Sequence, residues 1–149
     1  ILRHPANQFV EEFIGEERMN KELGGKTASS LMMSKVATVK DKRGLAEALK
    51  IMKSYTVDSL MVTNSEGVLE GVLELEILEE HFGDETKKVK DVMVPVTVSA
   101  TTTTPYTEIA ENFAKYKVKT VPVTEDGKLV GLITKSSMMR GLAGMKQNV

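Results

Sequence analysis

The chain has no cysteine and no tryptophan among its 149 residues, and its only histidines are His4 and His81. Without thiols it can form no disulfide, zinc–thiolate site or thiol nucleophile, and two histidines are too few for a multi-histidine metal site. No apolar run approaches the roughly 18 residues that a membrane span needs, and the opening ILRHPANQF lacks the apolar stretch of a signal peptide. The net charge is only −1, which argues against nucleic-acid binding. We therefore expect a cytoplasmic protein without catalytic machinery, and the non-initiator Ile1 suggests a piece of a longer chain.

The sequence repeats itself at an offset of 60 to 61 residues, an arrangement that indicates two similar structural units. Gly67 and Gly71 recur as Gly127 and Gly131. Between the start of each copy and these glycines lies an apolar set with the spacing i, i+3, i+4, i+7, which predicts an amphipathic helix in each copy. These residues are Leu45, Ala48, Leu49 and Met52 in the first copy and Tyr106, Ile109, Ala110 and Phe113 in the second.

Each predicted helix is followed by two short apolar strands joined by a turn. The strands begin at Leu60-Met61-Val62 and Val121-Pro122-Val123, and Asp126-Gly127 is a strong hairpin signal. In the second copy, Thr104 and Pro105 are expected to be the N-cap and first residue of the helix. Each copy thus predicts strand–helix–strand–strand–helix. Because about 55 residues bury little surface alone, we expect an α/β (α+β) protein with two units packed around a pseudo-twofold axis.

These motifs resemble the CBS domain, and two copies in tandem resemble a Bateman module. The second copy carries the central Val121-Pro122-Val123 strand and a closing segment that runs from Gly131 through Thr134 to Ser137. The family closes on G-h-h-T-x-x-D, so Ser137 stands where Asp is expected; in the first copy Glu74 and Ile77 replace the Thr and Asp. The resemblance implies one CBS domain over residues 28–87 and a second over residues 88–149.

The opening Ile1–Gly15 is similar to the end of the ATPase domain in osmoprotectant importers of the ABC type, which transport glycine betaine, carnitine or choline. Residues 1–27 are accordingly expected to be the helical tail of such a domain and a linker. This resemblance implies that the chain works with an ATPase domain and membrane permease subunits, at the inner face of the cell membrane. The CBS resemblance implies a homodimer through the CBS modules. Gly25-Lys26-Thr27 looks like the end of a P-loop, but Asn20 occupies the position of the first glycine. We therefore interpret Leu23–Thr27 as a flexible join, and the fragment as a non-enzyme.

The CBS resemblance also implies a cleft for an adenine nucleotide: cyclic di-AMP, AMP or ATP. Serine lacks the paired oxygens with which a carboxylate accepts from two ribose hydroxyls, so Ser137 favours cyclic di-AMP over AMP. No cofactor is expected to be required. The candidate ligand-binding residues are Ala37, Thr38, Val57, Ser59, Val96, Thr97, Thr120, Val121, Pro122, Ile133, Thr134, Ser136 and Ser137.

Two alternatives to nucleotide binding remain open from the residues. The chain could be a structural dimerisation module that binds nothing, with a cleft filled by its own side chains, or an ionic-strength sensor. Its charge is uneven: residues 28–90 carry 9 basic and 11 acidic residues, whereas residues 91–149 carry 7 and 5. The acidic stretch from Glu70 to Glu85 is either a solvated face or a divalent-metal site.

For the homodimer we expect exposed apolar faces that carry Met52, Phe113 and Met138.

Overall fold

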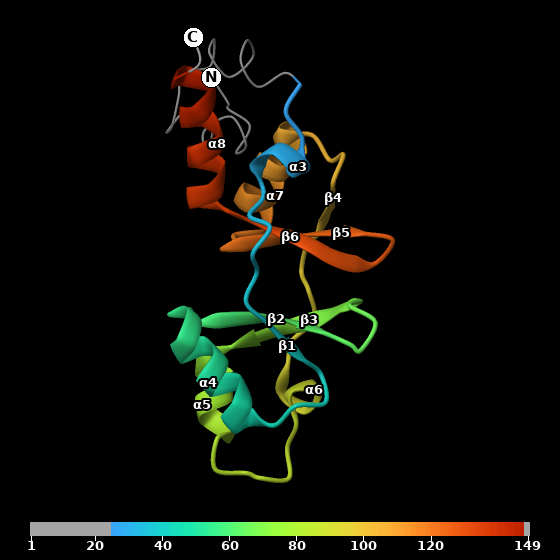
Figure 1. The fold of residues 1–149 in the computed structure, drawn as a ribbon, viewed down its shortest axis with the longest axis vertical. Coiled ribbons are helices and arrows are strands. Elements are labelled where there is room, and N and C mark those ends of the chain that lie inside the picture. The colour runs from blue at the N-terminus through green and yellow to red at the C-terminus, as the bar shows by residue number, and fades with distance from the viewer. Residues whose placement is uncertain (1–24, 148–149) are drawn as a thin grey trace. The chain divides into compact units, whose positions relative to one another are not determined.

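The computed structural model describes residues 25–147, which divide into two compact units (Figure 1). Unit 1 consists of the described parts of Ile1–Ser34, Thr97–Glu125 and Val130–Val149. Unit 2 consists of Lys35–Val96 and Asp126–Leu129. Residues 1–24, which hold the segment that resembles the end of an ATPase domain, lie outside the described residues. Each unit is therefore built mainly from one of the two sequence repeats.

Unit 2 holds the first repeat, in which a three-stranded sheet packs against helices. Its strands have the order β1-β2-β3, with β1 parallel and β3 antiparallel to β2. Figure 1 shows α4 and α5 together on one side of this sheet. The elements are β1 (Thr38–Lys40), α4 (Leu45–Tyr55), β2 (Ser59–Thr63), β3 (Leu69–Glu74), α5 (Leu75–His81) and α6 (Val89–Val92).

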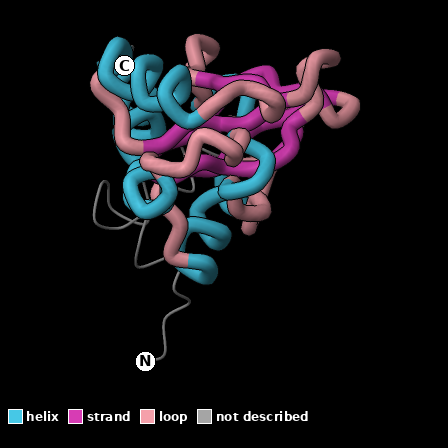
Figure 2. Tube along the Cα trace, turned by 90° about the horizontal axis from the view of Figure 1, so that it is seen from below, coloured by secondary structure: helices cyan, strands magenta, loops and turns pink. Residues whose placement is uncertain are grey.

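Unit 1 repeats this plan, with the strand order β4-β5-β6 and β4 parallel to β5. Helices α3, α7 and α8 lie on one side of its sheet in Figure 1, and Figure 2 distinguishes helices, strands and loops by colour. Both repeats follow the predicted order of elements. The elements are α3 (Ala28–Leu31), β4 (Ala100–Thr101), α7 (Tyr106–Tyr116), β5 (Thr120–Glu125), β6 (Lys128–Thr134) and α8 (Lys135–Gln147).

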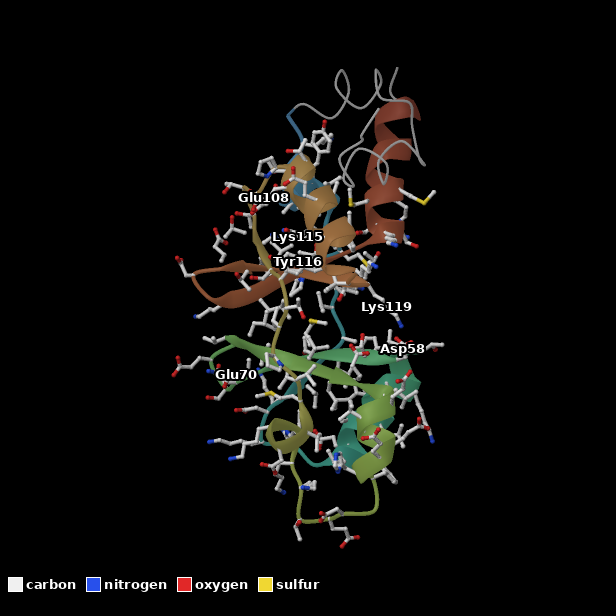
Figure 3. All side chains as sticks on the ribbon, turned by 180° about the vertical axis from the view of Figure 1, so that it is seen from behind. Asp58, Glu70, Glu108, Lys115, Tyr116 and Lys119 are labelled. Carbon is white, nitrogen blue, oxygen red and sulfur yellow. The ribbon has the colours of Figure 1, made fainter. Side chains whose placement is uncertain are left out.

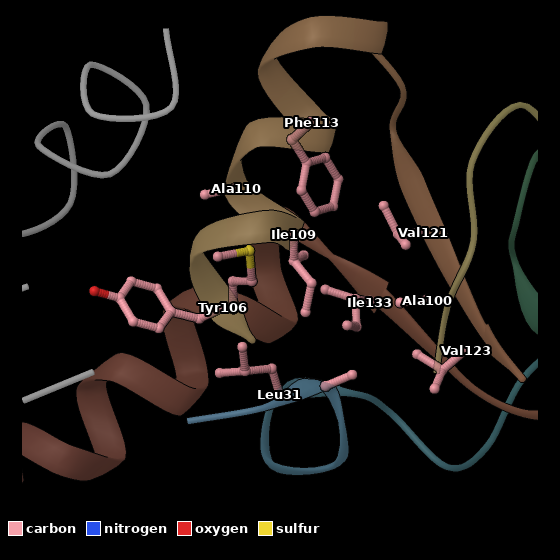
Figure 4. Close-up of a cluster of buried hydrophobic side chains, with 11 residues drawn as sticks. Leu31, Ala100, Tyr106, Ile109, Ala110, Phe113, Val121, Val123 and Ile133 are labelled. Atoms are coloured by element: carbon pink, nitrogen blue, oxygen red, sulfur yellow. The ribbon is translucent and has the colours of Figure 1, made fainter. Parts of the chain in front are cut away.

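The two predicted helical faces form the centres of two separate apolar cores. In unit 1 the α7 residues pack with Val121, Val123 and Ile133 from the sheet, as Figure 4 shows. In unit 2 the α4 residues pack with strand residues such as Leu60 and Leu73. All eight face residues are buried except Leu49, which is half-buried. The helical periodicity is thus confirmed in both repeats.

The predicted turn between the last two strands of each repeat is also confirmed. Gly67 and Gly127 have φ angles of 85° and 83°, and Asp126 has a φ of 54°. Glycine adopts this left-handed region without strain, because it has no Cβ. In the first repeat the Asn64 side chain accepts hydrogen bonds from the backbone N–H groups of Glu66 (2.8 Å) and Val68 (3.0 Å), which closes the turn.

The start of α7 differs from the prediction by one residue. Pro105 occupies the N-cap with an extended backbone, and Tyr106 is the first helical residue. The hydroxyl of Thr104 does not cap the helix; it accepts a hydrogen bond from the backbone N–H of Thr101 at 2.9 Å. Thr104 therefore closes the short turn after β4.

The expectation of a flexible join was wrong for Lys26 and Thr27. The Lys26 carbonyl accepts a hydrogen bond from the Tyr106 backbone N–H at 3.1 Å, and Thr27 forms a β-bridge with Pro105. The N–H of Ala28 donates to the Thr104 carbonyl at 2.9 Å. This segment is held by backbone hydrogen bonds that leave no composition signal in the sequence.

The faces expected to drive dimerisation were also misassigned. Met52, Phe113 and Met138 are only 2 to 3% exposed, and each belongs to the interior of its unit. Their apolar character stabilises the two cores, because a buried apolar side chain contributes about 1.5–3 kcal/mol by leaving water. Within residues 25–147, no helix is both long and apolar enough to span a membrane.

Candidate functional site

A pocket of about 460 Å³ opens in unit 1, where α7 leads into β5 and β6 leads into α8. This volume lies in the range of roughly 300–1,000 Å³ typical of small-molecule sites. Three short stretches of chain form its walls. They contribute Phe113 and Ala114, then Lys117, Val118 and Lys119, and finally Thr134, Lys135 and Ser136.

The turn between α7 and β5 presents two of these lysines. Lys117 follows the last residue of α7 in the left-handed conformation, with φ 52° and ψ 36°, a common way to end a helix. The chain then passes through half-buried Val118 to Lys119, and both lysines are exposed. Figure 3 labels Lys119 just before β5 and Tyr116 at the end of α7. Sharp reversal of the chain thus places two cations on one wall.

The third stretch of the lining begins at Thr134, which forms reciprocal hydrogen bonds with Ser137. The Ser137 N–H donates to Thr134 Oγ1 and the Thr134 N–H donates to Ser137 Oγ, both at 2.9 Å. The Ser137 hydroxyl in turn donates to the Thr134 carbonyl at 3.0 Å. This is the pattern of a capping box, which satisfies backbone groups at the start of a helix. Ser137 is only 5% exposed, so its hydroxyl serves the start of α8.

The charge of the pocket favours an anion. Its lining contains Lys117, Lys119 and Lys135, but no carboxylate. It also lies beside the start of α8, a helix of 13 residues, and helix N-termini attract anions through their unpaired N–H groups and the helix dipole. Phe113 and Val118 supply apolar surface next to these charges. The arrangement suits a phosphate attached to a flat, partly apolar group.

Only some of the predicted residues of the second repeat reach this pocket. Thr134 and Ser136 line it, and Thr120 is the first residue of β5, directly after Lys119. Val121 and Ile133 are fully buried in the core of unit 1. The remaining predicted residues in this part of the chain are outside the lining: buried Pro122, half-buried Val96 and exposed Thr97.

The predicted residues of the first repeat lie along the edge of β1 and the start of β2 in unit 2. The Ala37 carbonyl accepts a hydrogen bond from the Met61 N–H at 3.1 Å, and Thr38 pairs with Met61. Ser59 pairs with Glu74. Val57 follows α4 and is 39% exposed.

The three lysines and Phe113 are the residues that the sequence did not single out. The excess of basic residues after residue 91 was visible, but it did not indicate which lysines converge. Lys117 and Lys119 immediately precede β5, whereas Lys135 is separated from them by β5 and β6. A position-by-position comparison of the repeats would have pointed to Lys119, because it replaces the acidic Asp58 at an offset of 61.

The acidic stretch of the first repeat does not assemble a metal site. In the part of the chain that the structure describes, no three carboxylate or histidine side chains gather closely enough to hold a metal ion. Asp84 instead accepts hydrogen bonds from the Thr86 hydroxyl (2.5 Å) and the Thr86 N–H (3.0 Å). These two bonds lower the pKa of the Asp84 carboxyl below its usual value. The stretch is a hydrogen-bonded loop and a solvated helix face.

Comparison with known proteins identifies the family of the chain. The sequence profile of the CBS domain matches residues 28–80 and 89–144. The choline transport ATP-binding protein OpuBA of Bacillus subtilis is 33% identical over 142 residues. That match covers 93% of this chain and 37% of OpuBA, so the chain spans little more than a third of this relative.

Solved structures share the fold. CBSX2, a CBS-pair protein from Arabidopsis thaliana, was solved in complex with AMP; it has a TM-score of 0.72 and 25% identity, over 82% of this chain and 99% of that one. OpuCA of Staphylococcus aureus has a TM-score of 0.67 and 26% identity, over 76% of this chain and 97% of that one.

Proposed function

Since the chain belongs to the CBS domain family, we propose that it is the regulatory CBS pair of the ATP-binding subunit of an osmoprotectant importer, and that it senses an adenine nucleotide. The transported solute would be glycine betaine, carnitine or choline. Similarity to OpuBA along 93% of the chain supports the assignment to such an importer. A bound nucleotide would regulate transport by favouring one arrangement of the CBS modules over another.

The lysine-lined pocket of unit 1 is the observation that carries the ligand proposal. Its three lysines and the start of α8 provide positive charge for phosphate, and Phe113 provides apolar surface for a base. The solved complex of CBSX2 with AMP supports an adenosine ligand for this fold. Of the predicted ligand residues, Thr134 and Ser136 belong to this site.

The state of Ser137 supports cyclic di-AMP over AMP or ATP. Its hydroxyl is buried and is already engaged by the backbone of Thr134, so a ribose with two free hydroxyls gains no carboxylate partner there. A 3′,5′-linked cyclic dinucleotide presents fewer free ribose hydroxyls and still carries two phosphates. We therefore propose that it binds more tightly than AMP.

We also propose that the module is a homodimer on the cytoplasmic side of the membrane, joined to an ATPase domain and permease subunits. The large apolar side chains that remain exposed within the two units are candidates for the contact. Among the described residues they include Tyr55, Phe82, Tyr116 and Met139, each 43 to 61% exposed. Sedimentation velocity at tens of micromolar tests this, and a monomer at that concentration would contradict it.

Calorimetry with cyclic di-AMP, AMP and ATP tests the ligand proposal. Lys119→Ala should weaken binding roughly ten- to hundredfold, because it removes one charge-assisted contact to phosphate. Lys115→Ala is the matched control: this lysine lies over the Tyr116 ring, 5.3 Å from its centre, and is outside the pocket lining. Ser136→Trp should fill the pocket without disturbing the core, since Ser136 is exposed. Failure of all three nucleotides to bind would favour the structural dimerisation module instead.

A further inference from the structure

The corner of unit 1 that forms the pocket has an equivalent corner in unit 2, where the helix ends and the next strand begins in the same way but the side chains differ. At an offset of 61 residues, Thr56 corresponds to Lys117, and both residues end their helix in the left-handed conformation. Two residues further along, Asp58 corresponds to Lys119, and both are exposed. The turn that supplies two lysines in unit 1 therefore supplies a neutral and an acidic residue in unit 2.

The junction of strand and helix at the unit 2 corner is also acidic. Glu74 ends β3 and corresponds to Thr134 at an offset of 60 residues. It pairs with Ser59 at the start of β2, and the Leu75 N–H donates to the Asp58 carbonyl at 2.9 Å. Asp58 and Glu74 therefore flank one corner of the unit 2 sheet. Two carboxylates at one corner repel a phosphate, since like charges a few ångströms apart interact unfavourably even near water.

The helix that begins at this corner cannot compensate. Helix α5 has 7 residues, against 13 in α8. Glu74 is its N-cap and makes no capping hydrogen bond, so a carboxylate stands beside the helix start and would repel an anion drawn there by the helix dipole. Ile77 stands where Ser137 completes the cap in unit 1.

We propose that each chain binds its nucleotide phosphate only in unit 1, and that Asp58 and Glu74 are the specificity-determining residues that exclude it from unit 2. This rests on the proposed nucleotide-binding function. One repeat thus carries the binding site and the other is a non-binding copy. The two differ in charge at two pairs of equivalent positions, Lys119 with Asp58 and Thr134 with Glu74.

Amide chemical-shift mapping by NMR, with AMP as the probe, tests the proposal on the full chain. In the wild type, AMP should shift amides of residues 113–119 and 134–137 and leave residues 52–58 and 74–77 unchanged. Shifts in both sets would overturn this inference while leaving the proposed function intact. Shifts in neither set with AMP, ATP or cyclic di-AMP would contradict the proposed function itself.

A charge exchange tests the two named residues. Asp58→Lys combined with Glu74→Thr should create AMP-dependent shifts in residues 52–58, with at least a tenfold gain in affinity at unit 2. The control is Glu70→Lys combined with Glu66→Thr, which changes the charge of unit 2 equally at the other end of β3 and should create none. If the exchanged variant keeps its unit 1 site and its unfolding temperature but gains no second site, Asp58 and Glu74 are not the determinants.

Discussion

The two repeats build the same corner and then place opposite charges on it. Each ends its long helix with a left-handed residue, and each begins its next strand three residues later. Beyond that turn unit 1 presents Lys119 and unit 2 presents Asp58. A left-handed turn and a strand start constrain the backbone, whereas an exposed side chain is free to differ. One fold can therefore carry an anion site in one copy and repel anions in the other.

The interiors of the two units differ much less than these corners. Leu60, Val62 and Leu73 in unit 2 take the places of Val121, Val123 and Ile133 in unit 1. Each set packs against the apolar face of one helix, where close packing limits both volume and polarity. We therefore expect equivalent core mutations to have similar effects in the two units. Mutations at equivalent corner positions should have different effects in the two units.

The largest effect is expected from truncation of the equivalent core residues Phe113 and Met52. Phe113→Ala should lower the free energy of unfolding by about 3–5 kcal/mol, and Met52→Ala by about 2–4 kcal/mol, because each leaves a cavity in a filled core. Urea denaturation followed by circular dichroism measures both. A loss below about 1 kcal/mol in either variant would contradict the burial of that side chain.

A smaller difference is expected between the equivalent glycines Gly71 and Gly131. A Cβ on Gly71 would lie 2.7 Å from the Val94 carbonyl oxygen, which is backbone and cannot easily move. A Cβ on Gly131 would overlap the flexible Met32 side chain and would lie 3.0 Å from the Met33 carbonyl oxygen, a longer backbone contact than the one at Gly71. Gly71→Ala should therefore cost about 2 kcal/mol and Gly131→Ala about 1 kcal/mol. The reverse order in thermal unfolding would show that Met32 is the more rigid neighbour.

The cap of α8 should contribute less again. Ser137→Ala removes the hydroxyl that bonds to Thr134 and should cost about 1 kcal/mol. Ser136→Ala is the control, since Ser136 is exposed and lies outside the reciprocal bonds of the cap. Equal stability of the two variants would mean that the cap does not stabilise α8.

The smallest effect concerns Tyr106, whose counterpart Leu45 cannot ionise. Burial raises the pKa of Tyr106 above its usual value of 10. A folded pKa above the unfolded one stabilises the protein below pH 10, and this stabilisation is lost as the pH rises through the folded pKa. Wild-type stability should therefore fall above pH 10 more steeply than that of Tyr106→Phe. Parallel pH profiles would assign the loss to other groups.

The residue pattern alone determined the architecture of this protein. It was sufficient to have a 60- to 61-residue repeat, two helical faces with i, i+3, i+4, i+7 spacing, and the hairpins at Gly67 and Gly127. Buried positions select apolar residues and positive φ angles select glycine, so both can be recognised from residue type. Most of the predicted ligand residues followed from motif position. Val121 and Ile133 carry the motif, yet they are buried in the core, since alternate residues of a strand face opposite sides of a sheet.

Only the tertiary structure decided which side chains form the pocket and which backbone groups hold the segment around Lys26. Lys117 and Lys119 meet Lys135 because the helix end and the strand–helix junction are brought together across β5 and β6. Likewise, backbone hydrogen bonds hold Lys26 against Tyr106. Neither convergence appears in local composition, because long-range contacts between exposed residues or backbone groups impose no periodicity on the sequence.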